Sequence, residues 1–128
     1  MKKLLFLLLF CNFCFAQTKQ LVTKPSGAQK TLDSKNCKDV AKYAQMDIND
    51  NNISLFLQGG IAPSIDPTDL IFEKKYSLKF DDLGCMANKC AERYNHIIFN
   101  YLSKTYGEKW TKEIQKEVLG FKKWKKST

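Results

Sequence analysis

The sequence predicts an α+β fold: a small single domain in which about four helices pack on a two-stranded or three-stranded sheet, with one disulfide. Apolar residues alternate with other residues at Ile53, Leu55 and Leu57, which is typical of a strand with one buried face. Between Ala91 and Leu102, apolar residues recur instead at helical spacing. The chain of 128 residues is long enough for one such domain.

Residues 1–16 have the pattern of a signal peptide. Two lysines precede a short apolar run, and Ala16 supplies a small residue before a cleavage site. The run is too short to span a bilayer, which needs about 20 residues. A lipid anchor on Cys11 or Cys14 is the alternative, and it is disfavoured by the bulky phenylalanines directly before both cysteines. We therefore expect a periplasmic or secreted protein.

Three further segments are expected after the cleavage site. Residues 17–33 are polar and predict a flexible leader, because they show no apolar period. Residues 34–120 are expected to form the α+β domain, and residues 121–128 a basic-aromatic tail. Removal of the two signal lysines takes the formal net charge from +8 to +6. Residues 104–128 hold eight lysines and three glutamates, so most of this charge lies at the C-terminal end.

The first ordered element is predicted to be a helix that begins near Ser34 or Asn36. One face of this helix would carry residues at helical spacing, namely Cys37, Val40, Ala41, Ala44 and Ile48. A run of Asn and Asp at 49–52 would end it. Residues 53–58 predict a strand, which Gly59 and Gly60 would stop in a tight turn that requires glycine.

A second helix is predicted from Pro67 to Tyr76, with Asp66 as its cap and Phe72 on its buried face. Directly after it, apolar residues at 78 and 80 alternate with charged residues and predict a second strand.

The longest predicted helix begins after Asn88 and ends at Gly107. Its apolar stripe comprises Ala91, Tyr94, Ile97, Ile98, Tyr101 and Leu102. A last helix is predicted over residues 108–119, ended by Gly120, with Trp110, Ile114 and Val118 facing the core.

Three cysteines remain in the expected mature chain, which suggests one disulfide and one spare thiol. A Cys37–Cys85 disulfide would stabilise the fold by roughly 4 kcal/mol, against about 2 kcal/mol for Cys85–Cys90. Cys37–Cys90 closes a loop of nearly the same length as Cys37–Cys85. We favour Cys37–Cys85, with Cys90 as the spare thiol, because Gly84 fixes the backbone beside Cys85.

An ordered set of short motifs covers most of the chain from about residue 37 onward. The motifs are Gly59-Gly-Ile-Ala-Pro63, Phe72-Glu-Lys-Lys-Tyr76, Asp82-Leu-Gly-Cys85, Tyr94-Asn95, Phe99-Asn-Tyr-Leu102, Tyr106-Gly107 and Trp110. In this order they resemble a family of small exported uncharacterised proteins of Bacteroidota-type bacteria. The resemblance implies export and one compact domain. It lends no catalytic residue, because the family has no assigned activity.

No metal site is predicted. Asp47, Asn49 and Asn51 occupy the first three ligand positions of a calcium-loop pattern. The last position, which should hold a bidentate Glu, is Gln58. We therefore interpret the run as a polar helix end.

No catalytic residue and no cofactor are predicted either. Cys90 and His96 are six residues apart and fall on different faces of a helix, which disfavours Cys–His chemistry. The adjacent Asp81 and Asp82 would point to opposite faces of a strand, so they would not share a proton.

The predicted function is therefore that of an exported, non-enzymatic binding module that acts through a protein partner, of the immunity or inhibitor type. The alternative is an envelope-surface binder that uses the Lys-rich C-terminus on anionic lipid or lipopolysaccharide. Nucleic acid is not an expected partner of an exported protein. The candidate binding residues are Gly59, Gly60, Lys122, Lys123, Trp124, Lys125 and Lys126.

Overall fold

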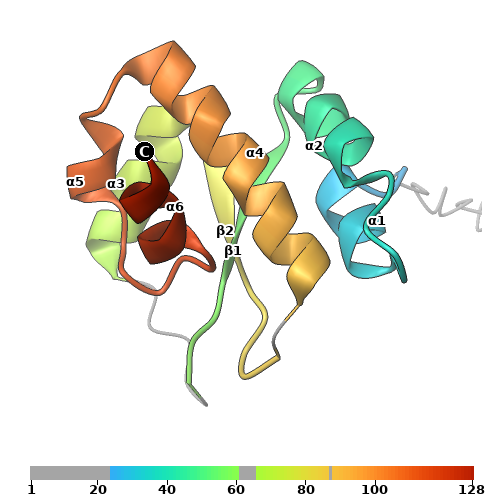
Figure 1. Cartoon of the computed structure of the whole chain (residues 1–128). Helices are drawn as coiled ribbons and strands as arrows, with labels where there is room; N and C mark the ends of the chain where they lie inside the picture. The colour runs from blue at the N-terminus through green and yellow to red at the C-terminus, as the bar shows by residue number, and fades with distance from the viewer. Residues whose placement is uncertain (1–23, 61–65, 87) are drawn as a thin grey trace, which may run out of the picture.

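A computed structural model describes residues 24–60, 66–86 and 88–128 (Figure 1). The predicted signal peptide and the first part of the predicted leader lie outside the described residues. In the described part, six helices pack on a two-stranded sheet, which confirms the α+β prediction, with more helices than the four or so expected. The elements are α1 (Gly27–Leu32), α2 (Val40–Asn49), β1 (Ile53–Leu57), α3 (Pro67–Tyr76), β2 (Leu78–Asp82), α4 (Lys89–Tyr106), α5 (Trp110–Glu113) and α6 (Phe121–Ser127).

The centre of the fold is a β1–α3–β2 unit with parallel strands. Ile53 pairs with Leu78, and the following residues pair one to one as far as Leu57 with Asp82. The predicted bounds of α3 are confirmed. Its first turn is held by a capping box, in which the Asp66 side chain accepts a backbone N–H and that of Asp69 accepts the N–H of Asp66. Phe72 on α3 stacks on Phe80 of β2 with 5.5 Å between ring centroids, so α3 covers one face of the sheet.

Helix α4 covers the other face of the sheet (Figure 1). Its predicted start and end are confirmed, because the Asn88 side chain accepts two N–H groups of the first turn and Gly107 follows the last residue at φ 70°. Tyr94 is fully buried and meets Phe56 of β1 edge-on at 5.4 Å. All five residues of β1 are buried as a result.

The prediction of one helix over residues 108–119 is wrong beyond α5. Ile114 is extended, and the chain then runs antiparallel to β1, with a single bridge between Leu57 and Val118. The buried side chain of Asn95 explains this path. Its Oδ1 accepts the Phe56 N–H at 2.9 Å, and its Nδ2 donates to the carbonyls of Phe56 and Leu119 at 2.9 and 3.0 Å. The free edge of β1 thus binds backbone that would otherwise continue the helix.

The predicted tail of residues 121–128 is part of the domain. Phe121 and Trp124 on α6 are buried and pack on Phe99 of α4 and on Trp110 of α5. The Trp124 indole N–H also donates to the Asn100 side chain at 2.9 Å. The domain therefore extends past the predicted boundary at residue 120.

The leader prediction is likewise wrong for residues 27–32, which form α1. The reason is Asp47 on α2, whose buried carboxylate accepts the N–H groups of Gly27 and Ala28 at 2.6 and 2.7 Å. The same carboxylate accepts the Tyr94 hydroxyl at 2.7 Å, so one side chain joins α1, α2 and α4. Gly27 permits this approach, because a Cβ there would collide with the Tyr43 carbonyl.

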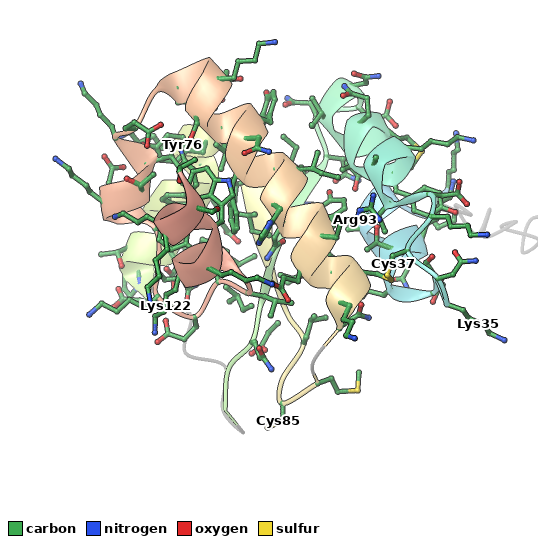
Figure 2. All side chains as sticks on the ribbon, in the orientation of Figure 1. Lys35, Cys37, Tyr76, Cys85, Arg93 and Lys122 are labelled. Carbon is green, nitrogen blue, oxygen red and sulfur yellow. A yellow bond between two sulfur atoms is a disulfide. The ribbon has the colours of Figure 1, made fainter. Side chains whose placement is uncertain are left out.

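The disulfide joins Cys37 to Cys90, and the predicted Cys37–Cys85 pairing is wrong. Cys90 is buried in the first turn of α4, 5.0 Å from Cys37 between Cα atoms. Among the cysteines that the structure describes, Cys85 is the free one, and it is exposed at the tip of the loop after β2 (Figure 2). The predicted helix start at Ser34 or Asn36 is also wrong, since α2 begins at Val40 and Cys37 has φ 54°.

Among the described residues, no helix is both long enough and apolar enough to cross a membrane.

Candidate functional site

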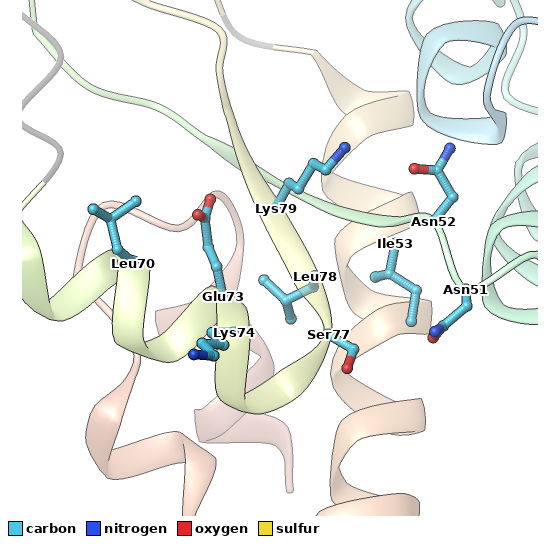
Figure 3. A pocket seen from close by; sticks show the side chains of 9 residues that line it. All are labelled: Asn51, Asn52, Ile53, Leu70, Glu73, Lys74, Ser77, Leu78 and Lys79. Atoms are coloured by element: carbon cyan, nitrogen blue, oxygen red, sulfur yellow. The ribbon is translucent and has the colours of Figure 1, made fainter. Parts of the chain in front are cut away.

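A hollow of about 380 Å³ lies where β1 and β2 begin, beside α3 (Figure 3). Figure 3 shows residues of α3 on one side of it and those preceding β1 on the other, with the start of β2 between them. We call this cavity the strand-start hollow. It is lined by Asn51, Asn52, Ile53, Leu70, Glu73, Lys74, Ser77, Leu78 and Lys79.

Two residues that line the strand-start hollow have left-handed backbone. Asn51 has φ 54° and Ser77 has φ 52°, and among the described non-glycine residues only Cys37 shares this sign. Asparagine tolerates this conformation, whereas serine at the C-terminal cap of a helix costs roughly 1 kcal/mol relative to glycine. At Ser77 this conformation ends α3, where the Ser77 N–H donates to the Glu73 carbonyl.

Five of the polar side chains that line the strand-start hollow are exposed to solvent and have no hydrogen-bond partner within the described residues. They are the amides of Asn51 and Asn52, the Ser77 hydroxyl and the ammonium groups of Lys74 and Lys79. The single carboxylate, Glu73, already accepts the Phe80 N–H at 2.7 Å. Two lysines against one glutamate leave the hollow with a formal charge of +1.

An exposed aliphatic pair lies next to the strand-start hollow. Leu70 is 57% exposed and Ile71 is 65% exposed, although the same helix buries Phe72 and Tyr76 on its other side. We call Leu70 and Ile71 the α3 patch. Further along α3, Lys75 braces this helix against α5. Its ammonium group lies 2.8 Å from both carboxylate oxygens of Glu113.

This brace also perturbs two ionisable groups. The hydrogen bond from Lys75, with a further one from the Tyr76 hydroxyl at 3.0 Å, lowers the pKa of Glu113. The same Glu113 hydrogen bond raises the pKa of Lys75. Both groups are therefore charged over a wide pH range, and Lys75 is engaged with its own chain rather than available to a ligand.

The predicted glycine turn does not need glycine for steric reasons. A Cβ at Gly59 would make only ordinary contacts with Asp82 at 3.8 Å, and one at Gly60 would meet nothing within 4 Å. Neither residue has the positive φ that would favour glycine. The rest of the predicted loop, residues 61–63, lies outside the described part, so its binding role stays a prediction.

The predicted C-terminal binding residues fall into two groups. Trp124 belongs to the core, so the prediction that it lies on a binding surface is wrong. Lys122, Lys123, Lys125 and Lys126 are exposed around it on α6. Lys123 pairs with Glu92 of α4 at 3.1 Å, which neutralises part of this basic surface.

Three of the residues considered for catalysis or metal binding, Asp47, Asp82 and Cys90, have structural roles. Asp47 holds α1, and Asp82 accepts the Gly84 N–H at 2.7 Å in the turn after β2. Cys90 is in the disulfide and His96 faces Glu92 at 3.9 Å. Within the described ranges no three His, Cys, Asp or Glu side chains gather as a metal site would require.

Neither the α3 patch nor the strand-start hollow was anticipated from the sequence. A signal for the patch was present, because Leu70, Ile71 and Phe72 are three consecutive apolar residues in a predicted helix. Successive helical residues point about 100° apart, so a single buried face cannot hold all three. The hollow has no comparable signal, since it forms only when β1 and β2 pair.

Comparison of the chain with protein-family models, with curated proteins and with solved structures found no match. The resemblance to exported Bacteroidota-type proteins therefore stays a prediction.

Proposed function

We propose that the protein is an exported, non-enzymatic binding module that engages a protein partner through the α3 patch. The observation that carries the proposal is the exposure of Leu70 and Ile71 side by side on a helix whose other face is buried. Single exposed aliphatic residues are common on protein surfaces, whereas contiguous apolar patches rimmed by polar residues mark interaction sites.

Export is supported by the Cys37–Cys90 disulfide, because disulfides persist in oxidising compartments such as the periplasm and the extracellular space. A non-enzymatic role is supported by the engagement of Asp47, Glu73 and Asp82 in hydrogen bonds to backbone N–H groups. An inhibitor or immunity role for such a module would need no chemistry beyond binding.

The test is a capture experiment on an envelope extract at about 1 M salt, where exposed ion pairs are screened and apolar contacts persist. Wild type and Ile71→Lys are compared, with Met86→Lys as the matched control. Met86 is 70% exposed on the loop after β2, so both variants exchange an exposed apolar side chain for lysine. We expect a protein that wild type and Met86→Lys retain and Ile71→Lys loses. Equal capture by all three would refute the proposal.

A further inference from the structure

The edge of β2 that faces away from β1 carries backbone groups that could pair with another strand. The Leu83 N–H donates to the Leu57 carbonyl at 3.0 Å, so every second residue of this segment directs its backbone groups to β1. The N–H of Phe80 points the other way, because it donates to the Glu73 side chain at 2.7 Å. The outward-facing residues of β2 are therefore Leu78, Phe80 and Asp82. We call this row of backbone groups the β2 edge.

The two edges of the sheet differ in what covers them. On the outer edge of β1, the Phe56 carbonyl accepts the Leu119 N–H, and the Gln58 N–H donates to the Glu117 carbonyl, each at 2.9 Å. Within the described residues the sheet has two strands, so no third strand pairs with the β2 edge. Unpaired strand edges are templates for pairing with a further chain.

The sequence of β2 is complementary in charge to itself when two copies run antiparallel about Phe80. This register places Lys79 opposite Asp81 of the second copy, and both side chains are exposed. Opposite charges that face each other across two strands are stabilising. A shift of the symmetry axis by one residue would instead place two copies of Lys79, or two copies of Asp81, opposite each other. Charge therefore selects the register centred on Phe80.

The central hydrogen bond of this register is already occupied in the monomer. Two antiparallel copies would exchange N–H···O=C bonds between their Phe80 residues. The Phe80 N–H is instead bound to the Glu73 carboxylate, which Figure 3 shows between α3 and β2. A charged acceptor binds an N–H more strongly than a neutral carbonyl does. The Glu73 contact therefore opposes the pairing of two β2 edges.

We propose that the β2 edge pairs antiparallel with the β2 edge of a second copy of this chain, and that Glu73 is the contact that holds this edge closed in the monomer. Pairing would join two two-stranded sheets into one. An edge of five residues is short for an interface, since stable ones bury about 800 Å² per partner, so the pairing is weak while Glu73 is in place. The contact does not use Leu70 or Ile71 and is independent of the proposed function.

Sedimentation equilibrium of the full chain over a wide concentration range tests the proposal. We expect Glu73→Ala to form dimers with a Kd about 100-fold lower than that of wild type, because each of the two Glu73 contacts in a pair accounts for about tenfold. The matched control is Glu117→Ala, which removes an exposed glutamate beside the opposite edge of the sheet and should behave as wild type does. Equal association of wild type and Glu73→Ala would overturn the proposal.

A charge exchange separates specific pairing from aggregation of a destabilised variant. Adding Asp81→Lys to Glu73→Ala would set lysines opposite each other and should return the protein to a monomer. Adding Lys79→Asp to that double variant restores opposite charges and should restore the dimer. Association of all three variants to the same extent, or into species larger than dimers, would show non-specific aggregation and overturn the proposed register.

Discussion

Replacement of Asp47 by Asn is expected to destabilise the domain strongly, although it changes a single atom type. The carboxylate accepts three hydrogen bonds on its two oxygens, from Gly27, Ala28 and Tyr94. An asparagine has one acceptor oxygen, and its NH₂ group would face a buried donor. Gly27 and Ala28 could not both keep their bonds while the Tyr94 hydroxyl also kept its own.

The magnitude follows from these contacts. One lost charge-assisted hydrogen bond costs about 1.5–3 kcal/mol, and the buried donor left without an acceptor costs about 1–3 kcal/mol more. Relief from burying a charge offsets part of this loss. We therefore expect Asp47→Asn to lower the free energy of unfolding by about 2–4 kcal/mol, out of roughly 5–15 kcal/mol for a domain.

Urea unfolding followed by tryptophan fluorescence measures this change, because Trp110 and Trp124 are both buried. The matched control is Asp39→Asn at the start of the same helix, where Asp39 is exposed and its side chain makes no capping hydrogen bond. The control should lie within about 0.5 kcal/mol of wild type. Hydrogen exchange should also show lost protection of the Ala28 amide in Asp47→Asn. A stability equal to that of the control would refute the proposed role of Asp47.

Three further predictions concern pH, the disulfide and the lysines of α6. Burial, together with the hydrogen bond to Asp47, raises the pKa of Tyr94 above its unfolded value. The free energy of unfolding should therefore fall as the pH rises above about 10, and fall less steeply in Tyr94→Phe; parallel curves in alkaline urea titrations would contradict this. Paired replacement of Cys37 and Cys90 by Ala should cost roughly 4 kcal/mol for a sequence separation of 53, whereas Cys85→Ala should be nearly neutral. Neutralising Lys122, Lys125 and Lys126 with Gln should leave partner capture unchanged even at about 0.1 M salt, where exposed charges still act over about 10 Å, because the proposed contact is made by the α3 patch; loss of capture at this salt would favour the envelope-surface alternative.

The parts of the fold that were predicted correctly are those fixed by local signals. Asp66 and Pro67 open α3 by side-chain capping and by a preset φ, and both act within one turn. Asn88 and Gly107 delimit α4 in the same way. Such boundaries depend on neighbouring residues alone, so the sequence contains the information needed to place them.

The parts that were missed depend on residues far apart in the chain. Helix α1 is held by Asp47, and the extended segment near Val118 by the free edge of β1 and by Asn95. The cysteine pairing could not be decided by loop entropy, since Cys85 and Cys90 close loops of similar length with Cys37. The choice between the two pairings is decided by the burial of Cys90 in α4, which brings it next to Cys37.

The candidate site was missed for the same reason: it depends on residues that are far apart in the chain. Lysines were the most visible binding candidates in the sequence, yet one of them, Lys123, is paired with Glu92. The hollow beside α3 combines short segments around residues 51 and 77 that the parallel pairing of β1 and β2 brings together. Neither segment is distinctive by itself, so the site emerges only from the tertiary structure.

The central claim is that a protein partner docks on the α3 patch, and site-specific photo-crosslinking tests it most directly. A photoreactive phenylalanine derivative is placed at position 71 in one sample and at position 86 in another, and each is irradiated in the producing cell. Both positions carry exposed apolar side chains, so their general reactivity should match. We predict one discrete protein adduct from position 71 that position 86 does not give. No adduct at position 71, or the same adducts from both positions, would contradict the claim.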